Sequence, residues 1–254
     1  MNRTGLIFGL MIAVVIVVTL AGCGGGSSGP KTPPVTTPRY GNERIFDDFS
    51  NVNSGWKTGG NNYCRYGYAK DGYVGYEMEI LTPGKHYALA WRPEMFTKYK
   101  VWVDVTNLSH GYNPEYGLLF NYFDDGDEDK DDEGYVFSII PEQRRFQIRK
   151  LNGDEWSLVH SDISDSINST NGAVNTLEVS YISNAIEFRI NGSEPVYTLS
   201  DFNSHPYYGE KIGLAVMNMV NGGTTAPFKV RFSNYNIVGD CVVNTIPATP
   251  TPGI

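Results

Sequence analysis

An acidic run at residues 124–133 has the composition of a cation-binding loop. Its sequence is DDGDEDKDDE, with eight carboxylates in ten residues. Asp125, Asp127 and Asp129 alternate as carboxylates do in loops whose oxygen atoms replace the hydration shell of Ca²⁺. The match to an EF-hand loop is partial, because Lys130 and Val136 stand where that loop has Gly and Glu. Two interpretations remain: a calcium site, or a solvated hairpin tip whose like charges discourage edge-to-edge pairing.

Aromatic residues next to planar polar residues form a second set that could do chemistry. A sugar is bound by flat aromatic faces that stack on its C–H groups and by polar groups that bind its hydroxyls. The pairs that could supply such groups are Trp91 with Arg92, Trp102 with Asp104, Asn121 with Tyr122, and Arg149 with Trp156. They could form a site only if they lie on the concave face of one sheet, and each could equally be an ordinary surface or core residue.

The body of the chain shows no motif for a nucleophile. The four histidines, His86, His110, His160 and His205, lie in or beside expected turns, and no serine of the body lies in a Gly-x-Ser-x-Gly turn. A phosphate-binding glycine loop and Cys-x-x-Cys metal ligands are also missing from the body. We therefore lean against an enzyme, although carboxylates that meet from separate strands would leave no trace in the sequence. The net charge of −8 and the pI near 5.0 argue against nucleic acid as a partner.

The N-terminus indicates where the protein resides. An uncharged run from Gly5 to Gly22 precedes Cys23, and residues 20–23 (LAGC) resemble the lipobox of prokaryotic lipoproteins, where the Cys thiol is acylated and the chain is cleaved before it. An uncleaved signal anchor is the alternative, since about 18 apolar residues nearly span a bilayer. We expect a signal peptide at 1–22, a lipidated Cys23 with a Gly/Ser/Pro tether at 23–39, a domain at 40–241 and a disordered tail at 242–254. The domain would then face the extracellular or periplasmic side of the cell membrane.

The body consists of short alternating segments that predict strands. Residues 73–80 and 99–105 alternate apolar and polar side chains, which is typical of half-buried strands. Further runs are expected at 116–122, 135–140, 145–151, 156–160, 176–182, 185–190, 211–217 and 228–238. Asn152-Gly153, Ser183-Asn184 and Asn191-Gly192 mark turns between them. The sequence therefore predicts an all-β, antiparallel sandwich or jelly roll.

The order of several short motifs resembles the concanavalin A-like lectin/glucanase superfamily over residues 45–238. The motifs are DDFS at 47–50, SGW at 54–56, DGY at 71–73, YGLLF at 116–120, FSI at 137–139, the hairpin at 151–156, NTL at 175–177, RING at 189–192, GLA at 213–215 and FSNY at 232–235. The resemblance is closest to prokaryotic extracellular laminin-G-like domains, which often accompany 3-keto-disaccharide hydrolase-like domains. It implies a jelly-roll sandwich of two curved antiparallel sheets, with Trp56 in the core.

The resemblance also implies where catalytic carboxylates and a disulfide would lie. Glucanases of this superfamily carry a Glu-x-Asp-x-x-Glu strand, and this sequence lacks it. Glu77 and Glu79 share one strand face, which we interpret as a solvated outer face. Cys64 and Cys241 flank regions that neighbour each other in the superfamily, so an extracellular disulfide between them is expected, with two unpaired thiols as the alternative.

Three classes of function remain open. The leading hypothesis is a non-catalytic module on a lipid anchor that binds a polysaccharide or surface glycan. The others are a glycoside-processing hydrolase of the same superfamily and an adhesion domain for a protein partner whose identity the sequence does not reveal.

Overall fold

The computed structural model describes residues 42–70, 72–109, 114–123, 132–153, 155–182, 184–200, 210–219 and 227–242. The expected signal peptide, Cys23, the tether and the tail beyond residue 242 lie outside these residues, and so do Asp125, Asp127 and Asp129. The described residues contain no helix with the length and apolar character needed to cross a bilayer. They also contain no group of three or more His, Cys, Asp or Glu side chains placed to hold a metal ion.

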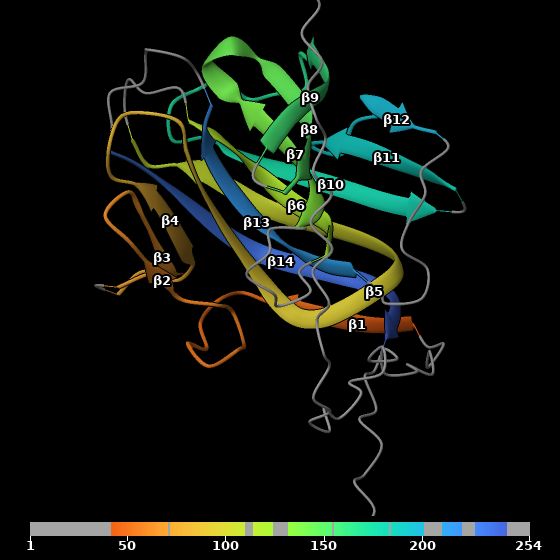
Figure 1. Cartoon of the computed structure of the whole chain (residues 1–254), viewed down its shortest axis with the longest axis horizontal. Coiled ribbons are helices and arrows are strands. Elements are labelled where there is room, and N and C mark those ends of the chain that lie inside the picture. Colours follow the sequence, from red (N-terminus) through yellow and green to blue (C-terminus); the bar gives the residue numbers. More distant parts are fainter. Residues whose placement is uncertain are drawn as a thin grey trace, which may run out of the picture. The chain divides into compact units, whose positions relative to one another are not determined.

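The described residues form one continuous antiparallel sheet of fourteen strands (Figure 1). The first seven strands are β1 (Asn42–Asp47), β2 (Gly59–Gly60), β3 (Cys64–Tyr68), β4 (Tyr76–Ile80), β5 (His86–Asn107), β6 (Glu115–Phe123) and β7 (Glu133–Ile140). A short 3₁₀ helix, η1 (Pro141–Gln143), precedes β8 (Arg145–Asn152) and β9 (Glu155–Ile163). The last five strands are β10 (Val174–Ile182), β11 (Ala185–Ile190), β12 (Tyr197–Leu199), β13 (Glu210–Asn218) and β14 (Phe228–Val242).

The sheet is folded into two layers because β5 takes part in both. Its first half, residues 86–96, pairs with β13, whereas residues 99–106 pair with β10. In Figure 1, β5 makes a deep curve between these halves. The first half continues through β13, β6, β7, β8 and β9, which we call the β6 layer. The second half joins β10, β11 and β12 on one side and β14 on the other, and β14 pairs with β1 and with β4, β3 and β2; we call this the β14 layer.

Alternating side chains from both layers form the shared core. In β5, Val101, Val103 and Val105 are completely buried, and they face buried aromatic residues of the other strands. Trp56 lies in this core against Phe49, Tyr76 and Tyr235, so the expectation that it is a structural plug is confirmed. The jelly-roll sandwich predicted from the sequence is likewise confirmed.

The sequence predicted only the second half of β5. Pro93 interrupts the first half, and a proline within a strand usually indicates an edge or a bulge. Here Pro93 lies where the register with β13 shifts, between the pairs Trp91–Gly213 and Met95–Lys211. The missing N–H therefore falls where the ladder is already irregular, and the strand continues through the bend.

The expected disulfide is wrong. Cys64 pairs with Ile80 at the end of β4, and Ile80 pairs with Phe228 at the start of β14, whereas Cys241 lies at the far end of β14. Phe228 and Cys241 are thirteen residues apart along β14, which corresponds to about 40 Å in an extended strand. A disulfide needs the two Cα atoms within about 7 Å of each other. Both cysteines are buried and free.

Candidate functional site: the concave face of the β6 layer

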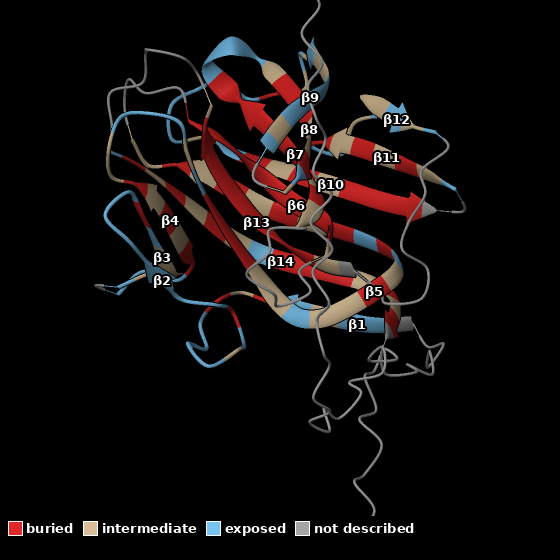
Figure 2. Cartoon of the chain, viewed as in Figure 1, coloured by how far each residue is buried: buried red, intermediate tan, exposed pale blue. Residues whose placement is uncertain are grey.

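The central strands β6 and β13 of the β6 layer are buried on both faces. In β6, Tyr116, Leu118 and Phe120 point into the shared core, while Leu119 belongs to a second apolar cluster on the outer face. This outer cluster consists of Leu89, Leu119, Tyr122, Val136, Leu151, Ala215 and Met217, with Trp91, Trp156 and Met219 packed against it. Figure 2 shows β6 and β13 buried along nearly their whole length. A sheet with both faces covered has near-continuous apolar strands, as seen in YGLLF.

One cross-strand row brings two sequence-predicted residues onto the outer face. Trp91 pairs with Gly213, and Gly213 with Leu119. Leu119 pairs with Val136, and Val136 with Arg149. Since neighbouring strands lie about 4.8 Å apart, Trp91 and Arg149 are separated by about 19 Å along this row.

The outer face is concave. Tyr87 lies on β5 and Trp156 on β9, at opposite edges of the β6 layer, five strand spacings or about 24 Å apart if the sheet were flat. Their rings nevertheless meet edge to face, with centroids 5.6 Å apart. The sheet must therefore curve until its two edges approach each other over the apolar cluster. Tyr87 is 38% exposed and Trp156 is half-buried, so this aromatic bridge borders solvent.

Trp91 and Tyr122 form a second aromatic pair on the same face. Their ring centroids are 4.9 Å apart, and the Lys57 ammonium lies 4.2 Å from the centre of the Trp91 ring. The Tyr122 hydroxyl donates a hydrogen bond of 2.8 Å to Asp132. Trp91 is half-buried, whereas Tyr122 is almost fully buried. Trp91 is thus the member of this pair that a ligand could touch.

A buried ion pair lies on the concave face, where Glu115 begins β6. The Arg149 guanidinium donates to both carboxylate oxygens of Glu115, at 2.8 and 3.2 Å, and to the side-chain oxygen of Gln147 at 2.6 Å. Ser138 donates to the same carboxylate at 2.7 Å. Glu115 is only 2% exposed, so this carboxylate is fully engaged with these partners.

Arg92 does not join Trp91 in a site, because neighbouring residues on a strand point to opposite faces. Its guanidinium binds Glu94 through two hydrogen bonds and Asp47 through a third of 3.0 Å. Asp47 also accepts from the Trp56 indole at 3.0 Å. Burial lowers the pKa of Arg92, but Glu94 and Asp47 outweigh this effect and raise it overall. Arg92 therefore connects β5 to the end of β1.

Asn121 and Trp102 also lie away from the concave face. Asn121 has a positive φ of 49° at a bulge in β6, and its side chain accepts a hydrogen bond from the buried Tyr99 hydroxyl. Trp102 alternates with the buried valines of β5, so it lies on the outer face of the β14 layer, where it pairs with Glu178 and Asn236. Asp104, two residues from Trp102 on the same face, accepts a hydrogen bond from Thr176. Of the eight residues in the predicted carbohydrate-binding pairs, the structure thus brings together Trp91, Tyr122, Arg149 and Trp156.

Sequence reasoning missed Tyr87, Glu115 and Gln147 on this face. Tyr87, Leu89 and Trp91 alternate in the first half of β5, a signal that Pro93 obscured. Glu115 begins a strand in which both faces are buried, so its neighbours show no alternation that would assign it to one face.

Comparisons with known proteins bear on the fold. No protein-family model matches the chain, and no curated protein matches it significantly. The carbohydrate-binding module CBM66 from Bacillus subtilis matches with a TM-score of 0.52 and 12% identity, over 73% of this chain and 96% of that one. The Bacillus licheniformis beta-glucanase matches with a TM-score of 0.54 and 11% identity, over 77% and 97%. A galectin-like protein of unknown function from Bacillus subtilis matches with a TM-score of 0.55 and 16% identity, over 81% and 99%.

At such low identities these likenesses establish the fold alone. The chain shares the jelly-roll sandwich fold of these structures, as its order of motifs implied.

Proposed function

We propose that this protein is a non-catalytic carbohydrate-binding module, held at the cell membrane by a lipid on Cys23, that binds a polysaccharide on the concave face of the β6 layer. The observation that carries the proposal is the convergence of Tyr87, Trp91 and Trp156 on that face. Partly exposed aromatic rings offer the flat apolar surface on which sugar rings stack. Two structural neighbours, a carbohydrate-binding module and a glucanase, agree with a carbohydrate ligand.

The surroundings of Glu115 favour binding over hydrolysis. Glycosidases use two carboxyl groups about 5 to 9.5 Å apart that flank the scissile bond. The partners of Glu115 among the described residues are Arg149 and Ser138, and its neighbour on β13 is Met217, so none of them is acidic. A carboxylate held by arginine and shielded from solvent is poorly placed to act as an acid or a nucleophile.

The test is a binding screen of the purified protein against soluble glycans and insoluble polysaccharides. We expect affinities from about micromolar to millimolar, since sugar hydroxyls compete with water for polar contacts. Tyr87→Ala and Trp156→Ala should each weaken binding at least about tenfold, which corresponds to about 1.4 kcal/mol.

Trp102→Ala is the matched control, because it removes a half-buried tryptophan from the other layer. Equal losses for Trp102→Ala and Trp156→Ala would contradict the concave-face site. Sugar release during the screen would make the protein a hydrolase, and the absence of any glycan ligand would favour an adhesion domain.

Two further experiments test the expectations about residues that the structure does not describe. A chelator should reproduce the effect of Asp127→Ala if calcium occupies the acidic loop at Asp125, Asp127 and Asp129. Cys23→Ala should abolish lipid labelling and leave an uncleaved precursor, and normal processing of this variant would contradict the lipoprotein hypothesis.

A further inference from the structure

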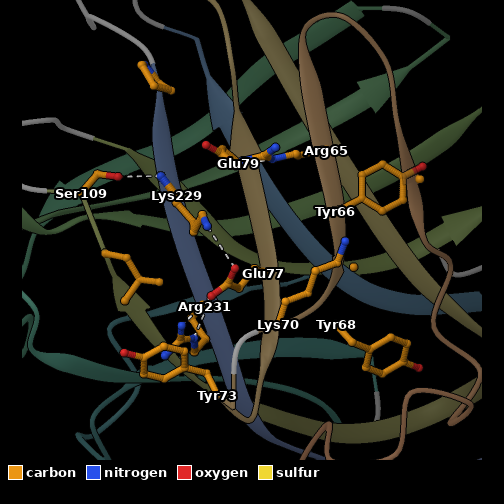
Figure 3. A pocket seen from close by; sticks show the side chains of 14 residues that line it. Arg65, Tyr66, Tyr68, Lys70, Tyr73, Glu77, Glu79, Ser109, Lys229 and Arg231 are labelled. Atoms are coloured by element: carbon orange, nitrogen blue, oxygen red, sulfur yellow. Dashed lines mark hydrogen bonds and ion pairs between the residues drawn. The ribbon is translucent and has the colours of Figure 1, made fainter.

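The outer face of the β14 layer carries an open pocket of about 810 Å³ (Figure 3). Its floor consists of the outward-facing residues of β3, β4 and β14, because Tyr76, Met78 and Ile80 of β4 point into the core. The loop between β3 and β4 supplies Lys70 and Tyr73 to one wall. The pocket is far larger than a single inorganic ion needs and falls in the range of small-molecule sites, about 300 to 1,000 Å³.

Two cross-strand rows order the charges on the floor. In the first row, Glu79 pairs with Lys229 on one side and Arg65 on the other. In the second row, Glu77 pairs with Arg231 on one side and Gly67 on the other. Gly67 has no side chain, so the second row ends without a charged group, beside the Thr58 side chain.

Hydrogen-bond donors outnumber acceptors in this pocket. Glu77 is held by Arg231 at 2.5 Å and by Lys229 at 3.1 Å, while the Arg65 Nε binds Glu79 at 2.5 Å. These contacts leave the two terminal nitrogens of Arg65 available for a ligand, since a guanidinium has five N–H donors.

Lys70 adds a fourth basic residue to two acidic ones. Its side chain is exposed and makes no ion pair with another described residue. The pocket therefore carries a local surplus of positive charge in a chain whose net charge is −8.

Tyr73 supplies an aromatic platform beside the basic groups. Its ring is 63% exposed, and the Arg231 guanidinium lies 4.5 Å from its centre. A sugar could stack on the exposed part of the ring while its acidic group binds the basic side chains.

From the surplus of donors, the exposed ring and the volume, we propose that this pocket binds a saccharide bearing carboxylate groups, such as a chain of uronic acids. Arginine recognises carboxylates through paired N–H donors, and the two rows offer positive groups at separate points along such a chain. This site lies in the other layer from the concave face of the β6 layer, so it does not depend on the function proposed there.

The experiment titrates the purified full-length protein with an oligogalacturonate, with a neutral oligosaccharide of the same length and with a polyglutamate peptide. The oligogalacturonate should bind, and binding should weaken steeply when salt is raised to about 0.3 M, because exposed charges are screened. Lys70→Ala and Tyr73→Ala should each weaken binding at least about tenfold.

Gly67→Val should block the pocket without removing any charge. A Cβ at Gly67 would lie 3.6 Å from the Thr58 side chain, an ordinary contact, and a β-branched residue suits a strand. Lys98→Ala is the control for charge, since Lys98 is an exposed lysine on β5 that does not line the pocket.

Equal weakening by Lys98→Ala and Lys70→Ala, or full binding by Gly67→Val, would overturn the proposal. Tight binding of the neutral oligosaccharide or of polyglutamate would overturn it as well, because the ligand would then not be an acidic sugar. Trp156→Ala should leave oligogalacturonate binding unchanged, so failure of either site can be distinguished from failure of the other.

Discussion

Arg149 illustrates how a buried charge constrains a residue that could otherwise bind a ligand. Its side chain is 14% exposed and donates hydrogen bonds to Glu115 and Gln147. Removing one partner of a buried ion pair lowers the free energy of unfolding, because the other charge stays buried without an opposite charge beside it. Arg149 therefore mainly stabilises the concave face by holding Glu115 and Gln147 in place.

Arg149→Ala should destabilise the protein by about 3 to 5 kcal/mol, since it leaves the Glu115 carboxylate with Ser138 as its remaining described partner. Urea unfolding measures this loss. The double variant Glu115→Leu/Arg149→Leu should recover much of it, because an apolar pair of similar volume can replace a buried ion pair. A loss below about 1 kcal/mol for Arg149→Ala would show that solvent reaches the pair.

At the scale of the element, β6 and β7 approach each other so closely that a side chain is excluded at one position. A Cβ at Gly117 would lie 1.8 Å from the backbone oxygen of Phe137, so any other residue forces the two strands apart. Gly67 on β3 has the room that Gly117 lacks.

Gly117→Ala should therefore cost about 3 kcal/mol, at the upper end of the range for overpacking. Gly67→Ala should stay within about 1 kcal/mol of the wild type, because alanine restricts the unfolded chain without a clash. Thermal unfolding of the two variants compares them directly. A similar loss of stability in both variants would mean that the change in strand propensity dominates. The close approach of β6 and β7 at Gly117 would then not explain the effect.

The ion pairs of Glu77 on β4 with Lys229 and Arg231 on β14, which we call the charge ladder, make the stability of the fold depend on pH. Burial raises the pKa of Glu77, but hydrogen bonds and charge from Arg231 and Lys229 outweigh it and hold the pKa below its usual value of 4.5. A carboxyl group with a lowered pKa in the folded state contributes stability above its unfolded pKa and loses it as the pH falls through the folded value.

The free energy of unfolding should thus fall as the pH drops below 4.5. Glu77→Gln should lower stability at neutral pH and make this acid-dependent loss smaller. Part of the loss should remain, because Arg92 likewise holds the pKa of Glu94 below its usual value against the effect of burial. Urea unfolding at neutral and acidic pH tests this, with the exposed Glu142→Gln as control. An unchanged acid dependence in Glu77→Gln would contradict the role of the ladder.

At the scale of the whole molecule, both layers are held together without a covalent link between Cys64 and Cys241. Burial raises the pKa of both thiols, and the nearby Glu43 and Glu94 carboxylates raise that of Cys241 further. A raised thiol pKa lowers the thiolate fraction and hence the reactivity.

Alkylation followed by peptide mass spectrometry should therefore modify Cys64 and Cys241 slowly in the native protein and fully after unfolding without reductant. A peptide that joins the two cysteines would contradict the structure. Reductant should leave the melting temperature unchanged, since it has no bond between these residues to break.

The sequence by itself determined the fold class and most of the strands. A strand imposes the same local geometry wherever it lies in a fold. The alternation in residues 99–105 and the turn at Asn152-Gly153 could therefore be recognised without the tertiary structure. The outer-face position of Glu77 and Glu79 followed from the same alternation, whereas the core position of Trp56 followed from the resemblance to a known superfamily.

Only the tertiary structure decided which residues meet. Trp91 and Arg92 are adjacent in sequence yet face opposite sides of β5, whereas Tyr87 and Trp156 lie far apart in sequence and touch because the β6 layer curves. The two cysteines flank the domain in sequence, but Cys64 on β3 lies two strands from the start of β14, whereas Cys241 lies near the other end of that long strand. The physical reason is that side-chain direction alternates locally, while proximity between strands depends on register, bulges and the curvature of the whole sheet.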